Sequence, residues 1–230
     1  MKGNMHMDYL HGTDMKIIQN PDMFHSCSDT ELLGCFMRVK RKDRVLDIGT
    51  NNGALLLYAS VHHPYYMHGI DLFEEVIETA NTNAKRNQVP MTLSVSSLQQ
   101  FQSAPFDLIL CNPPYFHTTA DQLKNENIYL KAARHEEYLT LEDLFSNVKR
   151  LLKDNGRFDM VYRPTDLFRV FSTANRYGFF CTRMRIAYAS INGRAKTVLL
   201  EFTRKKTGET MIEPPAFLND RSSFGWTEWV

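Results

Sequence analysis

Hydrophobic and polar positions follow two different periods along the chain, and each period predicts one kind of element. Short apolar or alternating runs bounded by turn residues predict strands at residues 44–49, 66–71, 91–95, 106–111 and 157–162. Apolar positions three and four residues apart predict amphipathic helices at residues 31–37, 54–59, 74–87, 138–152 and 164–177. Because strands and helices alternate, we expect a mostly parallel sheet with helices on both faces.

Local signals suggest where two of these helices begin and end. Ser28-Asp29-Thr30 offers an N-cap to the helix at 31–37, since hydroxyl and carboxylate oxygens accept from the free amides of a first turn. Gly156 is expected to end the helix at 138–152, because glycine suits the residue after a helix.

The C-terminal part of the chain changes period. Residues 179–188 and 195–204 are rich in β-branched and aromatic residues, and Asn192-Gly193 between them predicts a hairpin turn. Five alternating units closed by an antiparallel hairpin make one domain, without an internal repeat. The predicted organisation is an N-terminal arm and helix at 1–40, a catalytic domain at 41–217 and a tail at 218–230.

The stretch that organises this pattern is Asn112-Pro113-Pro114-Tyr115, directly after the strand at 106–111. Proline cannot continue a sheet ladder, so the strand must stop there. The Asn112 side-chain oxygen and the Pro113 carbonyl can each accept a hydrogen bond from an amino group. Tyr115 can stack on a ring that bears that group. The motif therefore predicts a site for a planar amine.

A second candidate site follows the strand at 44–49, where Thr50-Asn51-Asn52-Gly53 leads into a helix. Strand, glycine turn and helix form the geometry of a doubly wound nucleotide-binding sheet. Asp47, however, would repel a pyrophosphate and suits a cation or an amine, as in S-adenosylmethionine (SAM). Asp71 ends the next strand, where acids accept hydrogen bonds from both ribose hydroxyls.

Composition excludes some classes of protein. The 230 residues include 43% hydrophobic and 23% charged ones, ordinary values for a globular domain. The net charge of +1 does not decide whether the protein binds nucleic acid, and any surface that does so must be local. No apolar run reaches the length of a membrane span and no signal-peptide core is present, so we expect a cytoplasmic protein. The four cysteines, Cys27, Cys35, Cys111 and Cys181, are scattered, and no two have the spacing of a metal site. We therefore expect them to form neither disulfides nor a metal centre.

These motifs together resemble class I SAM-dependent methyltransferases that modify exocyclic or amide nitrogens. The flanking residues are similar to the bacterial tRNA1(Val) (adenine-37-N6)-methyltransferase family, over about residues 8–217. They are Asp8-Tyr9-Leu10, Ile17-Ile18-Gln19, Phe24, Asp29, Leu32-Leu33, Phe36, Ala133-Arg134-His135-Glu136, Arg204-Lys205-Lys206 and Pro214-Pro215. The resemblance implies an α/β fold, a doubly wound, mostly parallel, seven-stranded Rossmann-like sheet with an antiparallel C-terminal hairpin.

The resemblance also implies the site residues and partners. The expected catalytic set is Asn112, Pro113, Pro114 and Tyr115. The expected SAM-binding set is Gln19, Phe24, Asp47, Gly49, Thr50, Asn51, Gly53, Asp71, Leu72, Ser97, Leu98 and Asn112. The candidates for contact with RNA are Lys124, Lys131, Arg134, His135, Arg194 and Lys196, with Arg183, Arg185 and Arg204-Lys205-Lys206 also available. The expected partner is tRNA, without a membrane or a metal, for a monomer or weak homodimer.

The implied function is transfer of a methyl group from SAM to N6 of an adenine in tRNA, the adenine 3′ of the anticodon in a valine tRNA. Two positions depart from the family pattern. The loop at 50–53 holds fewer glycines than usual, and Ser96-Ser97 stands where an acid is usual.

Other functions remain open. One is methylation of a glutamine side chain in a release factor, although such enzymes carry a helical domain for which the residues before Arg44 are too few. Another is methylation of an amine in rRNA. A third is a binding module for SAM or RNA without catalytic activity.

Overall fold

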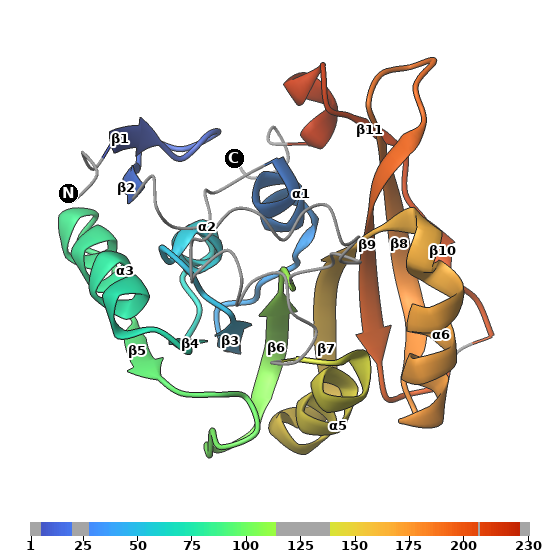
Figure 1. The fold of residues 1–230 in the computed structure, drawn as a ribbon, viewed down its shortest axis with the longest axis horizontal. Coiled ribbons are helices and arrows are strands. Elements are labelled where there is room, and N and C mark those ends of the chain that lie inside the picture. The colour runs from blue at the N-terminus through green and yellow to red at the C-terminus, as the bar shows by residue number, and fades with distance from the viewer. Residues whose placement is uncertain (1–5, 20–27, 114–138, 207, 226–230) are drawn as a thin grey trace, which may run out of the picture.

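A computed structural model of the chain describes residues 6–19, 28–113, 139–206 and 208–225. It shows a mixed sheet with the strand order β10-β8-β9-β7-β6-β3-β4-β5, in which β11 also pairs with β8 (Figure 1). The seven long strands are β3 (Arg44–Ile48), β4 (Tyr66–Asp71), β5 (Thr92–Val95), β6 (Phe106–Cys111), β7 (Leu152–Tyr162), β8 (Phe180–Tyr188) and β9 (Ala195–Thr203). The predicted seven-stranded α/β sheet is confirmed. Two short strands, β10 (Met211–Ile212) and β11 (Ala216–Phe217), extend it beyond β8.

Strands β3 to β7 are parallel, and β9 lies antiparallel between β7 and β8. The helices are α1 (Ser28–Phe36), α2 (Ala54–Ser60), α3 (Glu74–Arg86), α5 (Leu141–Leu151) and α6 (Leu167–Arg176), with short 3-10 helices η2 (Pro164–Asp166) and η3 (Arg221–Phe224). A two-stranded ribbon of β1 (His6–Tyr9) and β2 (Lys16–Gln19) forms the N-terminal arm.

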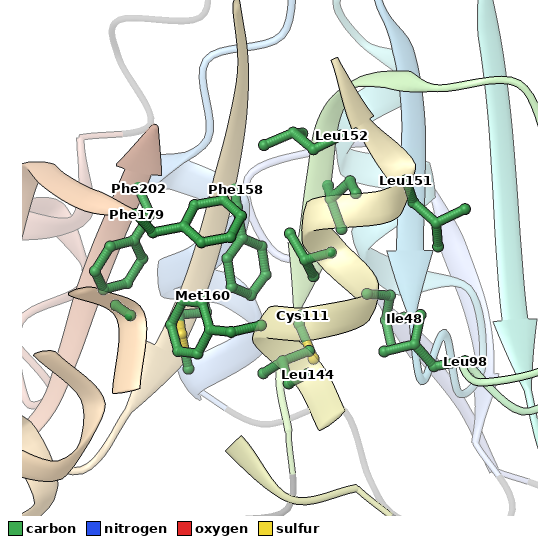
Figure 2. Close-up of a cluster of buried hydrophobic side chains, with 14 of the residues drawn as sticks. Ile48, Leu98, Cys111, Leu144, Leu151, Leu152, Phe158, Met160, Phe179 and Phe202 are labelled. Atoms are coloured by element: carbon green, nitrogen blue, oxygen red, sulfur yellow. The ribbon is translucent and has the colours of Figure 1, made fainter. Parts of the chain in front are cut away.

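Successive strand residues feed two cores on opposite faces of the sheet, as the pleat requires. Leu46, Ile109 and Cys111 join α5 and α6 in one core, whereas Val45 and Leu110 join α1 and α2 in the other. Figure 2 shows Cys111 among the side chains of the first core, close to Leu144. This packing fixes the end of β6, the position that leads into Asn112.

The same alternation assigns a face to the polar residues between them. Asp47 lies two residues beyond Val45, and Asn112 two residues beyond Leu110. Both therefore follow the face that α1 and α2 cover. Asp47 pairs with Leu110 across the parallel ladder. Asn112 therefore lies two residues further along the neighbouring strand than the partner of Asp47.

Two predictions of where a helix begins or ends are wrong. Helix α1 already begins at Ser28, so Ser28-Asp29-Thr30 forms its first turn and does not precede it as an N-cap. Helix α5 ends at Leu151 rather than at Gly156, because Leu152 is extended and starts β7 at once. Gly156 instead lies in a register shift of β7, where a Cβ atom would come within 2.7 Å of the Leu152 side chain.

The hairpin between β8 and β9 exists, but its turn is not centred on Asn192-Gly193. The Gly193 amide donates to the Ser190 carbonyl at 2.8 Å, which places Ile191 and Asn192 at the centre of the turn. Neither Asn192 nor Gly193 has a positive φ, so the two-residue turn expected of an Asn-Gly pair is not formed.

The last described residues of the chain bond to Arg185 of β8. Arg185 donates from Nη1 to the Phe224 carbonyl at 3.0 Å and from Nη2 to the Ser223 carbonyl at 2.5 Å, and the Phe224 side chain is buried. These bonds hold η3, within the region predicted as a tail, against the domain.

Candidate functional site

The candidate site lies at the carboxyl edge of the sheet, where β3, β4 and β6 end. In the strand order, β3 has β4 on one side and β6 on the other, so the connections leave β3 in opposite directions. Open α/β sheets bind ligands at such a switch point, outside the carboxyl ends of the strands. The β3 loop, Asp71 at the end of β4 and Asn112 directly after β6 lie at this one edge, because the three strands are parallel.

The loop after β3 has the tight turn that the sequence predicts. Gly49, Asn51 and Gly53 have φ values of 68°, 49° and 83°, all in the left-handed region. Asparagine tolerates that region better than most residues, so Asn51 takes a conformation usually given to glycine. The Gly49 and Thr50 amides both donate to the Ile70 carbonyl, at 3.0 and 2.9 Å, which ties the loop to β4. The loop therefore forms a tight turn with Asn51 beside its two glycines in the left-handed region.

Asp47 is a buried acid at the base of this loop, with only 1% of its surface exposed. Its Oδ2 accepts a hydrogen bond from the Thr50 hydroxyl at 2.8 Å, whereas Oδ1 has no partner among the described residues. Burial raises the pKa of Asp47 to about 7. A buried carboxylate oxygen without a partner is costly unless a cation or donor reaches it. Asp47 thus fits the ammonium group of SAM.

Asp71 ends β4 and accepts hydrogen bonds from the segments that follow β3 and β4. Its Oδ2 accepts from the Asn51 amide at 3.1 Å, and its Oδ1 accepts from the Leu72 amide at 2.8 Å. Burial raises the pKa of Asp71. Each carboxylate oxygen can accept more than one hydrogen bond, so Asp71 retains capacity for ribose hydroxyls. The Leu72 side chain is partly exposed beside it.

Asn112 stands at the end of β6. Its side-chain nitrogen donates to the Thr30 hydroxyl of α1 at 3.1 Å. This leaves the side-chain oxygen as the free end of the amide, and Pro113, which follows it, is buried. Burial of Cys111 in the core holds the backbone of this segment. The arrangement presents an acceptor of the kind that an amino group requires.

Other predicted SAM-binding residues are placed as follows. Gln19 is buried at the end of β2 and donates to Asp8 Oδ2 at 3.2 Å. The Ser97 carbonyl accepts from the Phe101 amide at 3.0 Å, in a turn that follows β5. Leu98 belongs to the core under α5, and its carbonyl accepts from the Arg150 guanidinium at 3.1 Å.

Several predicted residues lie outside the described part of the chain: Phe24, Pro114, Tyr115, Lys124, Lys131, Arg134 and His135. Of the candidates for RNA contact, Arg194 and Lys196 are exposed at the β8–β9 hairpin. Arg183 and Arg185 are 2% and 9% exposed. The suggestion that these two are available to RNA is wrong, because their guanidinium groups bond inside the protein.

Sequence reasoning missed two residues that build the site. Thr30 bonds Asn112, as described above. Asn83 of α3 is fully buried: it accepts from the Ile18 amide at 2.7 Å and donates to the Asn52 carbonyl at 2.9 Å, so it joins β2 to the β3 loop. A signal existed for Asn83, since it is a polar residue on the apolar face of a helix that also buries Val76 and Ala80.

The described ranges hold no group of three or more His, Cys, Asp or Glu side chains that could bind a metal ion. Within the same ranges, each helix is too short or too polar to cross a lipid bilayer. The described cysteines, Cys35, Cys111 and Cys181, are free thiols.

Comparison with known proteins places this geometry in a family. The model of the methyltransferase small domain matches residues 14–167, which include β3, β4, β6 and the whole carboxyl edge described above. The chain belongs to the methyltransferase small domain family. The resemblance inferred from the sequence is confirmed by relatives that carry the name tRNA1(Val) (adenine(37)-N6)-methyltransferase.

Two such relatives illustrate the likeness. The protein from Bacteroides thetaiotaomicron is 33% identical over 189 residues, 79% of this chain and 77% of the relative. The protein from Dyadobacter fermentans is 28% identical over 201 residues, 85% of this chain and 82% of the relative. Among solved structures, a methyltransferase from Pyrococcus furiosus covers 84% of this chain and 90% of its own, with a TM-score of 0.62 and 16% identity. That similarity shows the shared methyltransferase fold.

Proposed function

We propose that this protein transfers a methyl group from SAM to N6 of an adenine in tRNA, at the position 3′ of the anticodon in a valine tRNA. The observation that carries the proposal is the Asn112 amide at the end of β6, bonded through its nitrogen to Thr30 so that its oxygen remains the free acceptor. The names of the relatives support the choice of tRNA and of adenine N6.

The residues at the carboxyl edge fit SAM. Asp47 provides a buried carboxylate oxygen that no described residue bonds, which suits an ammonium group. Asp71 would accept from the ribose hydroxyls, and the left-handed turn at Gly49 and Gly53 allows close approach to the backbone. When bound, SAM supplies a methyl group that its positive sulfonium activates for transfer.

The protein's contribution to catalysis is to hold the acceptor amine. An adenine N6 is a weak nucleophile because its lone pair is delocalised into the ring. Hydrogen bonds from N6 to Asn112 Oδ1 and the Pro113 carbonyl draw the amine toward tetrahedral geometry and free that lone pair. The same two acceptors stabilise the positive charge that develops on N6, so they act most strongly in the transition state. No strong general base is needed, because the proton leaves N6 after the new bond has formed.

The target base must leave its stack to reach Asn112, which costs less in an anticodon loop than in a duplex. Tyr115 and Phe24 are proposed to stack on the base or on the ligand. Lys124, Lys131, Arg134 and His135, in the segment after the motif, are proposed to contact RNA.

The β8–β9 hairpin extends this proposed RNA surface. Strand β8 is antiparallel to β9, which is antiparallel to β7, so β8 ends at the same edge as β6 (Figure 1). Arg194 and Lys196 therefore lie at the carboxyl edge of the sheet, and Arg163 donates to the Lys196 carbonyl at 3.2 Å. Phe168, at the start of α6, is 85% exposed and offers a ring for base stacking.

We also propose that the protein is a cytoplasmic enzyme, a monomer or weak homodimer, with a catalytic domain at 41–217 preceded by an arm and helix. Size-exclusion chromatography with light scattering tests the oligomeric state directly.

The deciding experiment is methyl transfer from labelled SAM to bulk tRNA from a strain that lacks this protein, followed by nucleoside mass spectrometry. N6-methyladenosine that forms with the parent protein, and at least about a hundredfold more slowly with Asn112→Ala, supports the proposal, since loss of one preorganised hydrogen-bond group of this kind costs about 10²–10³ in rate. Label in protein or rRNA, with none in tRNA, would instead favour a glutamine or rRNA methyltransferase. SAM binding without any transfer would leave a binding module.

A further inference from the structure

Thr30 is a buried hydroxyl that lies against the catalytic motif from a distant part of the chain. It belongs to the first turn of α1 and is 8% exposed. Its Oγ1 accepts the hydrogen bond from the side-chain nitrogen of Asn112 at 3.1 Å, across 82 residues of sequence. The contact joins the N-terminal helix to the residue on which the proposed chemistry depends.

The two ends of the Asn112 amide have opposite hydrogen-bonding character. The oxygen accepts, whereas the nitrogen donates and would oppose the N–H groups of an incoming amine. Both orientations fill nearly the same volume, so packing alone selects poorly between them. A hydroxyl can donate as well as accept, so the hydrogen bond to Thr30 holds the amide against α1. In this structure the nitrogen faces α1 and the oxygen remains for the acceptor.

We propose that Thr30 is a positioning residue for methyl transfer: it fixes the Asn112 side chain so that its oxygen faces the acceptor amine. The inference rests on the proposed function and names a further residue of the same site. Thr30 acts through Asn112 and touches neither the acceptor nor SAM in this role.

Thr30 can position another side chain because α1 is itself held firmly. The adjacent Asp29 accepts from the Thr197 hydroxyl of β9 at 2.6 Å. Leu32 and Leu33 are fully buried in the core below, and at Gly34 an added Cβ would come within 2.6 Å of the Tyr58 ring, so α1 and α2 pack closely. A β-branched side chain in a helix also has few χ1 rotamers, which restricts where the Thr30 oxygen can lie.

The test compares Thr30→Val, which keeps the shape and removes the hydroxyl, with Thr30→Ser, which keeps the hydroxyl. Thr197→Val is the matched control, because it breaks the other hydroxyl bond that anchors α1 and leaves the bond between Thr30 and Asn112 in place. For each variant the single-turnover rate of N6 methylation is measured with saturating tRNA, together with the Kd of S-adenosylhomocysteine and the Tm.

We expect Thr30→Val to lower the rate about tenfold, the effect of one lost hydrogen bond, with the Kd within about twofold of the parent. Thr30→Ser should recover most of the rate, and Thr197→Val should lower the Tm more than the rate. The inference is overturned if Thr30→Val reacts as fast as the parent, if the serine variant is as slow as the valine variant, or if Thr197→Val loses as much rate at an equal fall in Tm. A parent protein that forms no N6-methyladenosine would overturn the proposed function instead.

Discussion

Two buried acids lie on the same face of the sheet, Asp47 on β3 and Asp159 on β7. Comparing them distinguishes a candidate ligand-binding acid from a structural one. Both are at most 1% exposed. Burial raises the pKa of Asp47 to about 7, and burial together with the nearby Glu201 raises the pKa of Asp159 to about 8. By depth and by pKa the two carboxyls are nearly equivalent.

Their partners differ. Asp159 lies 3.7 Å from the guanidinium of Arg183, which also pairs with Glu201 and Glu213, each at 2.9 Å. Asp47 has a neutral hydroxyl, that of Thr50, as its hydrogen-bond donor among the described residues. A protein supplies its own cation where a buried acid has a structural role. Asp47 has no cation paired with it within the described structure, and its charged neighbour there is another acid, Asp71, so it is the better candidate for a cation that arrives with a ligand.

The largest expected effect is on the structural side of this comparison. Arg183→Met should lower the free energy of unfolding by about 3–5 kcal/mol, because it leaves buried carboxylates without their cation. The variant also loses the hydrogen bond from Arg183 to the Phe36 carbonyl, at 2.8 Å, and the contact with the Phe36 ring. Urea denaturation measures the change, and Arg194→Met, at the exposed hairpin, is the matched control with a change below about 0.5 kcal/mol. Equal stability of the two variants would show that the Arg183 cluster has no structural weight.

The second largest expected effect is on ligand affinity at the candidate SAM site. Asp47→Asn should weaken S-adenosylhomocysteine about a hundredfold, because the ligand's ammonium loses a buried charged partner. The ligand-free variant should be at least as stable as the parent, since the buried charge is gone. Calorimetric titration at pH 7.5 measures the affinity, and Asp159→Asn should leave the Kd within about twofold. If both acids affect the Kd alike, the distinction drawn between them fails.

A smaller effect is the pH dependence that follows from the pKa of Asp47, about 7. The ionised carboxylate binds an ammonium, so affinity should fall by up to about tenfold for each pH unit below 7 and level off above it. The sign for stability is opposite. The folded-state pKa lies above the ordinary 3.8, so ionising Asp47 costs the ligand-free protein stability as the pH rises from about 4 to 7. Asp47→Asn should flatten the affinity profile, and a profile that keeps its slope would assign it to another group.

The sequence predicts a site residue when a short local pattern marks it, and fails when the residue's role depends on a distant partner. The strand before Asn112, the turn after β3 and the acid at Asp71 follow from short patterns, and the structure places all three at one edge. Asp159 and Arg183 give no such signal. Their pairing depends on the register of β9 between β7 and β8, which brings Glu201 beside both of them. From the sequence alone Arg183 therefore looks available to RNA, whereas in the structure it belongs to a buried ion-pair cluster.

The contact between Thr30 and Asn112 has the same origin. Nothing near Thr30 in the sequence shows that α1 lies over the end of β6, and a hydroxyl before an apolar run is an ordinary helix-start signal. Helix α1 takes its place from the long-range packing of Leu32, Leu33 and Phe36, which the periodicity predicts as buried without naming the neighbour. Burial could be predicted from the pattern, whereas the partner required the fold.

The smallest expected effect is a change in stability on substitution of Asn51, in the loop beside Asp47. Asn51 has a φ of 49°, in the left-handed region that glycine adopts most readily. Asn51→Gly should change the free energy of unfolding by less than about 0.5 kcal/mol, whereas Asn51→Ala should lower it by about 1–2 kcal/mol, because a Cβ without a polar group is disfavoured in that conformation. Urea denaturation of the two variants compares them directly. Because the Asn51 amide donates to Asp71, a strained alanine there should also weaken S-adenosylhomocysteine slightly, while glycine should not. Equal stability of the two variants would mean that the loop changes conformation to accept alanine. The left-handed turn would then not be required to bring the backbone close to the ligand.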